Sequence, residues 1–241
     1  MKMKIIDIKS FKNILINSVL AINDKMENAF CNLLIRLSLY DKYQPMIIKD
    51  YKNGFLGRDC YDRWDTIVPY LKNSSGSFLD MGCNIGFFTL KASEMGFLSY
   101  GIDVKRKNIL IANYQKKMKN LNNVFFMDHK INMDTVEKLP SFDVVCILSV
   151  FHHWVRHYGA ENAMDMMKVL SKKCRDVLIF ETGQPDEINK EWAKKLKFIS
   201  NNTKQWGEDF LKEIGFENVF EIGSFKSPVS SVNRSLFIAY K

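Results

Sequence analysis

The sequence predicts an α/β fold built around a doubly wound, Rossmann-like sheet of seven strands, most of them parallel. From residue 77 onward, short apolar runs alternate with helical stretches of roughly 10–15 residues, which is typical of βαβ units. A loop with two glycines follows the first apolar run, where a doubly wound sheet places its ligand-binding crossover. Two apolar runs joined by a polar turn close the chain and predict an antiparallel C-terminal hairpin strand. The expected strands cover residues 77–81, 98–103, 123–127, 142–149, 176–181, 218–223 and 235–240, with a helical region from 182 to 214.

The residues before this alternation predict a separate N-terminal part. Apolar side chains recur at helical spacing from Phe11 to Ile22, and residues 43–65 are rich in aromatic and charged side chains with proline and glycine breaks. We therefore divide the chain into an N-terminal helical extension and lid, residues 1–72, and a main domain, residues 73–241. No run approaches the ~18 apolar residues expected of a transmembrane helix. We instead expect the N-terminal helices to cover an edge of the main domain or to form an oligomer interface.

The charge and the cysteines narrow the choice of partners. The 241 residues carry a formal net charge of +8, which is compatible with polyanions or anionic substrates, although a composition rich in lysine, asparagine and isoleucine explains it equally well. No dense basic tract is present, so RNA is a possible partner that is not favoured, and DNA binding is not expected. The five cysteines form no C-x-x-C pair, which argues against disulfides or a zinc site and predicts a cytoplasmic protein.

The glycine loop "DMGCNIG", residues 80–86, indicates the charge of the ligand. Asp80 ends the first strand, and Gly82 and Gly86 follow before a helix. This spacing differs from G-x-G-x-x-G, and a carboxylate at the strand end would repel the pyrophosphate of a dinucleotide. The loop therefore disfavours an NAD-dependent dehydrogenase and favours a ligand that carries a cationic amine.

Two further acids complete this pattern. Asp103 ends the second strand, where a carboxylate can accept hydrogen bonds from a ribose diol. Asp128 ends the third strand and is placed to accept a hydrogen bond from an adenine amino group. An amine, a diol and an adenine amino group together describe S-adenosylmethionine. The alternative is that each acid only caps the helix that follows it.

Three motifs carry a resemblance to a known family: "GRDCYDRWD" (57–65), "DMGCNIGFFTL" (80–90) and "LSVFHHWVRHYG" (148–159). Residues 77–181 resemble the class I S-adenosylmethionine-dependent methyltransferases. Over residues 43–240 the chain is similar to the methyltransferase domain of bacterial O-antigen chain-terminating enzymes, which methylate a terminal phosphate on a polysaccharide. The glycine loop is general to the class, whereas the other two motifs are much narrower.

The resemblance implies which residues hold the cofactor. It assigns Arg63 to the cofactor carboxylate, which the planar guanidinium can bind through two hydrogen bonds, and Tyr43 to the same wall of the pocket. The spacing of Arg63 from nearby aspartates also allows a plain ion pair on a helix surface. The complete set of expected cofactor-binding residues is Tyr43, Arg63, Asp80, Gly82, Cys83, Asn84, Gly86, Phe87, Asp103, Val104, Asp128, His129 and Leu148.

The motif after the fourth strand indicates the acceptor site. His152 and His153 are adjacent at the end of a strand, so at least one of them should face the ligand cleft. Metal binding is a poor alternative, because the acids needed to complete a metal site are missing nearby, and we expect no metal. With Arg58, the two histidines are the expected catalytic residues. A sugar hydroxyl would need one histidine as a general base, whereas an ionised phosphate needs only cations to hold it.

These observations favour an S-adenosylmethionine-dependent O-methyltransferase. Its expected acceptor is a phosphate-type or other anionic group on a surface-polysaccharide precursor, of a capsule or an O-antigen, or on a related small metabolite. One alternative is a methyltransferase that modifies tRNA or another RNA. A second is a methyltransferase of a neutral sugar hydroxyl with a histidine base. A subunit that binds the cofactor without catalysis is disfavoured by the motifs for both sites.

Overall fold

The computed structural model describes residues 22–23, 25–48, 60–71, 76–200, 202–227 and 229–241. The chain divides into two compact units, residues 1–40 and 41–241. In the first unit, the described residues 22–23 and 25–36 are helical. The unit that holds the sheet begins at Asp41, which is earlier than the domain start predicted at residue 73. No helix among the described residues is both long enough and apolar enough to cross a membrane.

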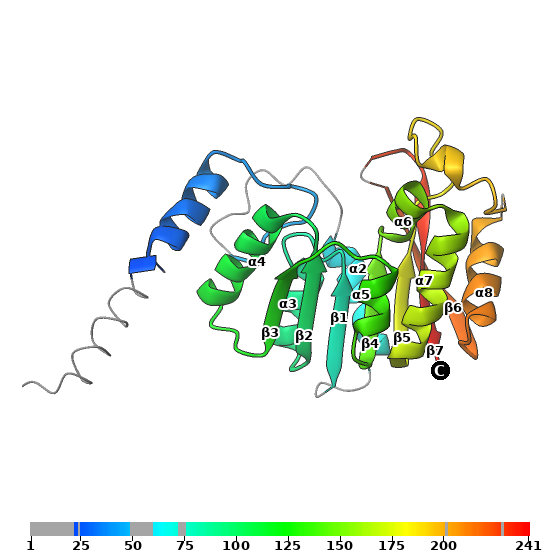
Figure 1. Cartoon of the computed structure of the whole chain (residues 1–241), viewed down its shortest axis with the longest axis horizontal. Coiled ribbons are helices and arrows are strands. Elements are labelled where there is room, and N and C mark those ends of the chain that lie inside the picture. The colour runs from blue at the N-terminus through cyan, green and yellow to red at the C-terminus, as the bar shows by residue number, and fades with distance from the viewer. Residues whose placement is uncertain (1–21, 24, 49–59, 72–75, 201, 228) are drawn as a thin grey trace, which may run out of the picture. The chain divides into compact units, whose positions relative to one another are not determined.

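The second unit contains the predicted seven-stranded sheet, in the order β3-β2-β1-β4-β5-β7-β6 (Figure 1). Neighbouring strands from β3 to β5 run parallel, whereas β7 is antiparallel to both β5 and β6. This confirms the predicted fold class and the antiparallel C-terminal hairpin. The strands are β1 (Ser77–Met81), β2 (Leu98–Asp103), β3 (Val124–Asp128), β4 (Phe142–Leu148), β5 (Cys174–Glu181), β6 (Asn218–Lys226) and β7 (Asn233–Tyr240).

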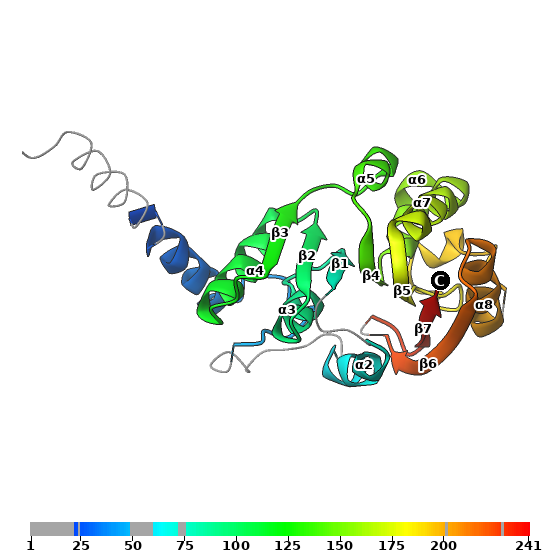
Figure 2. The same ribbon diagram turned by 90° about the horizontal axis from the view of Figure 1, so that it is seen from below.

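Helices cover both faces of this sheet (Figure 2). Successive strand residues point to opposite faces, so Phe78 enters the apolar core under α2 and α3, while Leu79 enters the core under α6, α7 and α8. The helices are α2 (Cys60–Ile67), α3 (Phe87–Glu94), α4 (Arg106–Met118), α5 (Met133–Lys138), α6 (Phe151–Tyr158), α7 (Ala160–Lys173) and α8 (Thr203–Glu213), with short 3-10 turns at Val68–Tyr70 and Ala193–Lys195.

Several predicted boundaries were wrong, and two of the errors have a clear local reason. The fourth strand ends at Leu148 rather than at Ser149, because Ser149 adopts a left-handed backbone with φ 62° that cannot continue the ladder. Residues 182–200 are mostly irregular rather than helical, and α8 begins only at Thr203. The turn-forming Gly183 and Pro185 stand at the start of this irregular segment.

The loop between β1 and α3 needs a glycine at position 86. Gly86 has φ +87°, and a Cβ there would lie 2.8 Å from the Phe126 ring and 3.1 Å from Ala112 Cβ. This glycine therefore lets the start of α3 pack closely against the sheet and α4.

We expect Gly86→Ala to destabilise the fold markedly. The left-handed backbone alone costs about 1–2 kcal/mol for a residue with a Cβ, and the contact with Phe126 adds to this. Gly215→Ala is the matched control, because Gly215 has φ +101° but its Cβ would approach only Lys241 Nζ, at 3.6 Å. Urea unfolding should show the larger loss for Gly86→Ala. Equal losses would mean that the packing of Phe126 is not tight.

Candidate active site

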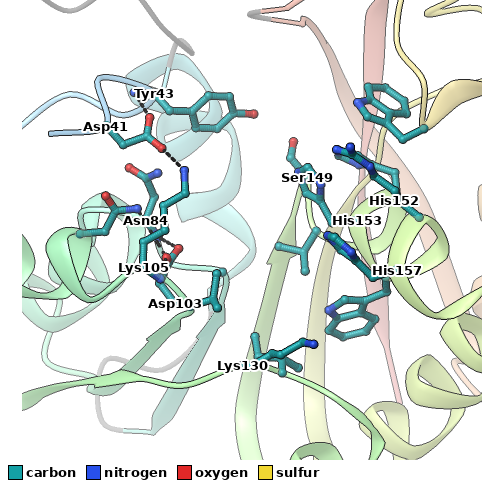
Figure 3. Close-up of a pocket in the computed structure, with 18 of the residues that line it drawn as sticks. Asp41, Tyr43, Asn84, Asp103, Lys105, Lys130, Ser149, His152, His153 and His157 are labelled. Carbon is teal, nitrogen blue, oxygen red and sulfur yellow. Dashed lines mark hydrogen bonds and ion pairs between the residues drawn. The ribbon is translucent and has the colours of Figure 1, made fainter.

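A cavity of about 600 Å³ lies at the carboxyl edge of the sheet, and all its lining residues belong to the second unit. Gly82, Val104 and Ser149, which follow β1, β2 and β4, line it, and β1 lies between β2 and β4 in the sheet. In open α/β sheets, ligands bind at this point, where the strand order reverses. Figure 3 shows two walls facing each other. The Asp103 wall holds Asp41, Tyr43, Asn84, Asp103 and Lys105, and the histidine wall holds Ser149, His152, His153 and His157.

Asp103 is fixed by the backbone around it. One carboxylate oxygen accepts a hydrogen bond from Asn84 N at 2.9 Å, and the other accepts one from Lys105 N at 2.8 Å. Burial raises the pKa of Asp103, against the opposing effect of these hydrogen bonds. Each carboxylate oxygen can accept a second hydrogen bond. The free acceptor positions suit the hydroxyl donors of the ribose diol that the sequence predicts.

Asn108 gives an independent indication that this wall receives a hydrogen-bond donor. Its amide group lies beside Asp103, with Nδ2 at 3.4 Å from Asp103 Oδ1, and the residue lines the cavity. Its buried Oδ1 has no hydrogen-bond partner among the described residues. Because an unsatisfied buried acceptor is costly, a hydroxyl or amino group at this point would stabilise the site. A ribose-containing cofactor fits this requirement.

Several residues predicted from the sequence line the same cavity. Gly82, Asn84, Val104 and His129 line the cavity in addition to Asp103, and Asn84 does so on the Asp103 wall. At position 82 a glycine is needed for packing, because a Cβ there would lie 2.4 Å from Val150 Cγ2. A larger residue at position 82 would therefore disturb the loop itself.

Other predicted cofactor residues do not line the cavity. Asp80 is buried and accepts a hydrogen bond from Thr89 Oγ1 at 2.7 Å, which ties β1 to α3. Burial raises the pKa of the Cys83 thiol well above its usual value. The remaining residues of this group, which the structure does not place on the cavity surface, are Gly86, Phe87, Asp128 and Leu148.

Tyr43 reaches the cavity on a strap, residues 41–48, that crosses the glycine loop. Asp41 Oδ2 pairs with Lys105 Nζ at 2.8 Å. Gln44 Oε1 accepts from Phe87 N at 3.0 Å and thereby caps the first turn of α3. Farther along, Ile47 N donates to Gln115 Oε1 at 2.7 Å. These three attachments place Tyr43 opposite the histidine wall (Figure 3).

The structure does not bring Arg63 to the cavity. Its side chain is 0% exposed, and Nε donates to Glu181 Oε2 on β5 at 2.8 Å. Nη2 donates to Lys226 O at 3.2 Å. Neither the predicted contact with the cofactor carboxylate nor the alternative of a pair on the helix surface describes this position. Arg58, the third expected catalytic residue, lies outside the described residues.

His152 is held in one protonation state by the backbone. Its Nδ1 accepts a hydrogen bond from Gly183 N at 2.9 Å, and the ring lies between His153 and Trp192, with both centroid distances 4.3 Å. A nitrogen that accepts a hydrogen bond carries no proton, so the ring is neutral and its proton is on Nε2. His152 is therefore not a cation, contrary to the expectation from the sequence, and Nε2 cannot act as a base in this state.

His153 is also neutral at neutral pH. It lines the cavity with part of its surface exposed. Its partial burial, together with the positive charges of His157, Arg156, Arg234 and Lys105, lowers the pKa of His153 to about 4. A base this weak is poorly matched to removing a proton from a sugar hydroxyl at neutral pH. The same positive surroundings would stabilise an anion.

Four basic side chains line the cavity, Lys105, Lys130, Arg156 and Arg234, against the two carboxylates of Asp41 and Asp103. Arg156 belongs to the motif at residues 148–159, whereas the sequence did not single out the other three. The polar Ser149 and the aromatic Trp192 were also missed. Lys105 could have been found from its place two residues after Asp103. Arg234 is distant in sequence from the other cavity residues, and no local pattern marks it.

Comparisons with known proteins agree with this geometry. Residues 79–178 match the family model "Methyltransferase domain". The O-antigen chain terminator bifunctional methyltransferase/kinase WbdD of Escherichia coli is 28% identical over 147 residues, which are 57% of this chain and 20% of that protein. The tRNA U34 carboxymethyltransferase of Ruthia magnifica subsp. Calyptogena magnifica is 26% identical over 167 residues, 65% of this chain and 51% of that protein. The chain thus spans about a fifth and about half of these two relatives.

Solved structures share the fold. A structure of WbdD has a TM-score of 0.73 and 23% identity, covering 87% of this chain and 45% of that one. Magnesium protoporphyrin IX methyltransferase of Synechocystis PCC 6803, solved with bound S-adenosylmethionine, has a TM-score of 0.55 and 20% identity, covering 75% and 78% of the two chains. The matched sequence region and the shared fold agree, and residues 79–178 therefore belong to a methyltransferase domain of the S-adenosylmethionine-dependent type.

Proposed function

We propose that this domain methylates an oxygen of a phosphate-type or other anionic group on a surface-polysaccharide precursor or a related small metabolite. The observation that carries the proposal is the charge of the cavity. Its four basic side chains outnumber its two carboxylates. They include Arg156 and Arg234, whose positive charges help to lower the pKa of His153. An anionic acceptor is stabilised in such a cavity, whereas a neutral hydroxyl gains little from it.

The proposed acceptor also explains why the cavity can work without a strong base. When bound, S-adenosylmethionine supplies an electrophilic methyl carbon on a sulfonium leaving group. A phosphate oxygen is already ionised at neutral pH, so the chain has to bind and orient it rather than remove a proton. His152 carries its proton on Nε2, and His153 is a weak base, so both fit this requirement.

The similarity to O-antigen chain-terminating enzymes supports the glycan part of the proposal. The relative named as a chain terminator is matched over only 20% of its length, so its acceptor is a starting point for experiment. RNA is the second candidate acceptor, because one relative is named a tRNA U34 carboxymethyltransferase and the chain has a net charge of +8. RNA backbones are also anionic, so the charge of the cavity alone does not separate the two.

Methyl transfer from radiolabelled S-adenosylmethionine to a matched set of acceptors tests the proposal. The set contains oligosaccharides with a terminal phosphate, the same oligosaccharides after phosphatase treatment, and unmodified tRNA. We expect label only in the phosphorylated glycan. Equal labelling of the phosphatase-treated sample would favour a neutral hydroxyl and a histidine base. Labelling of tRNA alone would replace the glycan by RNA.

A further inference from the structure

Arg234 is held rigidly at the edge of the cavity. It is the second residue of β7, its side chain is 1% exposed, and it lines the cavity beside Trp192, whose ring centroid lies 5.4 Å from the guanidinium carbon. Nε and Nη2 donate to the two carboxylate oxygens of Glu187 at 2.8 and 2.9 Å. Nη1 donates to Ser149 Oγ at 2.9 Å. The guanidinium plane is therefore fixed on two of its edges.

The partners of Arg234 are themselves fixed. Glu187 also accepts hydrogen bonds from Ser227 Oγ, Ser230 Oγ and Gln184 N, at 2.9, 2.7 and 3.0 Å. Burial alone would raise the pKa of Glu187, but the hydrogen bonds and charge of Arg234 lower it, so the carboxylate stays ionised.

Ser149 connects the guanidinium to a second buried ion pair. Its Oγ donates to Glu181 Oε1 at 2.9 Å, and the other oxygen of Glu181 accepts from Arg63. Buried ion pairs of this kind add little to stability compared with apolar residues of the same size. Their value here is that they hold one guanidinium in one orientation at the cavity surface.

The fixed guanidinium retains capacity to bind a ligand. An arginine has five N–H donors, and the contacts with Glu187 and Ser149 use three of them. One N–H on Nη1 and one on Nη2 remain without a hydrogen bond to any described residue. Guanidinium N–H groups of this kind are the donors that bind the oxygens of an oxyanion. Lys130 lines the same cavity and adds to its positive field.

Resting on the proposed function, we propose that Arg234 is the acceptor-binding arginine of this site, and that Glu187 and Ser149 position it to hold the oxygens of a terminal phosphate monoester. The phosphate oxygen that remains unbound forms the new bond to the methyl carbon while the carbon–sulfur bond breaks, and that electron pair stays on sulfur. The phosphate loses one negative charge and the sulfonium loses its positive charge, so no proton transfer is required. The weaker charge of the methylated diester also reduces its hold on Arg234, which favours product release.

Calorimetry of the S-adenosylhomocysteine complex with methyl phosphate as the probe tests this role. The variant Arg234→Lys keeps the charge against Glu187 but loses the planar fork. We expect its affinity for methyl phosphate to fall at least 10-fold, while its affinity for S-adenosylhomocysteine changes less than 2-fold. Arg175→Lys is the matched control, because Arg175 is an ion-paired arginine at the start of β5, the opposite edge of the sheet. It should bind the probe as the unmodified chain does.

A second variant separates positioning from folding. Glu187→Asp shortens the carboxylate and withdraws the guanidinium, and it should weaken methyl phosphate binding with S-adenosylhomocysteine binding unchanged, as Arg234→Lys does. In an assay of methyl transfer, both variants should raise KM for the phosphorylated acceptor more than they lower kcat. Equal probe binding by the unmodified chain and by both variants would overturn the role of Arg234 and leave the anionic acceptor standing. If the unmodified chain itself does not bind methyl phosphate, the proposed function fails as well.

Discussion

Replacing Asp103 by asparagine should weaken S-adenosylmethionine binding by roughly 10- to 100-fold, the range for losing hydrogen bonds to a charged group. The carboxylate already accepts hydrogen bonds from Asn84 N and Lys105 N, and its remaining acceptor positions face the cavity. Asparagine replaces one acceptor oxygen by a donor, which repels a hydroxyl donor of the ligand. The buried Oδ1 of Asn108, which has no partner among the described residues, would then be the remaining acceptor for the diol beside position 103.

Calorimetry with S-adenosylmethionine measures this loss, and thermal unfolding checks the fold. Burial raises the pKa of Asp103, which means that its ionised form destabilises the folded chain. Asp103→Asn removes this charge and should therefore keep a cooperative unfolding transition. Asp209→Asn is the control, since Asp209 is an exposed residue of α8 that accepts a hydrogen bond from Gln205 Nε2 and lies outside the cavity lining. If Asp103→Asn binds the cofactor as tightly as Asp209→Asn does, the diol site lies elsewhere.

We also expect a large dependence of anion affinity on pH, because His153 takes up a proton when an anion binds. In the acceptor-free site the pKa of His153 is lowered to about 4. A bound oxyanion raises that pKa, because it favours the imidazolium. Binding then takes up a proton between pH 4 and the raised pKa. In that window the affinity falls as pH rises, by at most about tenfold per pH unit, and it reaches a plateau above the raised pKa.

Sulfate is the probe for this effect, because it stays fully ionised across the window whereas a phosphate monoester titrates near pH 6. Calorimetry in buffers with different ionisation enthalpies gives the number of protons taken up, and His153→Gln should remove most of it. The other titratable or charged groups that line the cavity are Asp41, Tyr43, Asp103, Lys105, His129, Lys130, His152, Arg156, His157, Tyr158 and Arg234. The same pH slope in His153→Gln would assign the proton to one of these groups instead.

The strands of the sheet and the position of Asp103 could be predicted from the sequence, because both depend on local patterns. Apolar runs marked the strands, and an acid at the end of β2 is placed at the cavity by the strand itself. The order of βαβ units brought Asp103 and the glycine loop together without information from distant residues. The adjacent histidines were also correctly placed at the end of β4, where both line the cavity.

The chemistry of the other wall depended on contacts between distant residues. The partner of Arg63 is Glu181, 118 residues away, and the partner of Arg234 is Glu187, 47 residues away. The protonation of His152 is decided by one backbone N–H, that of Gly183. No spacing in the sequence reports such contacts. An arginine motif was therefore assigned to the cofactor when its buried partner was on β5, and the histidines were assigned charges that their surroundings remove.

The central claim is that this cavity joins a methyl donor to the oxygen of an anionic acceptor. Nuclear magnetic resonance of the product made with ¹³C-methyl-labelled S-adenosylmethionine and a terminally phosphorylated oligosaccharide tests it most directly. A new P–O–CH₃ bond splits the ¹³C methyl signal through coupling to ³¹P, and we expect this split signal from the unmodified chain and a much weaker one from Arg234→Lys. A single unsplit methyl signal, formed equally on the dephosphorylated oligosaccharide, would contradict the claim.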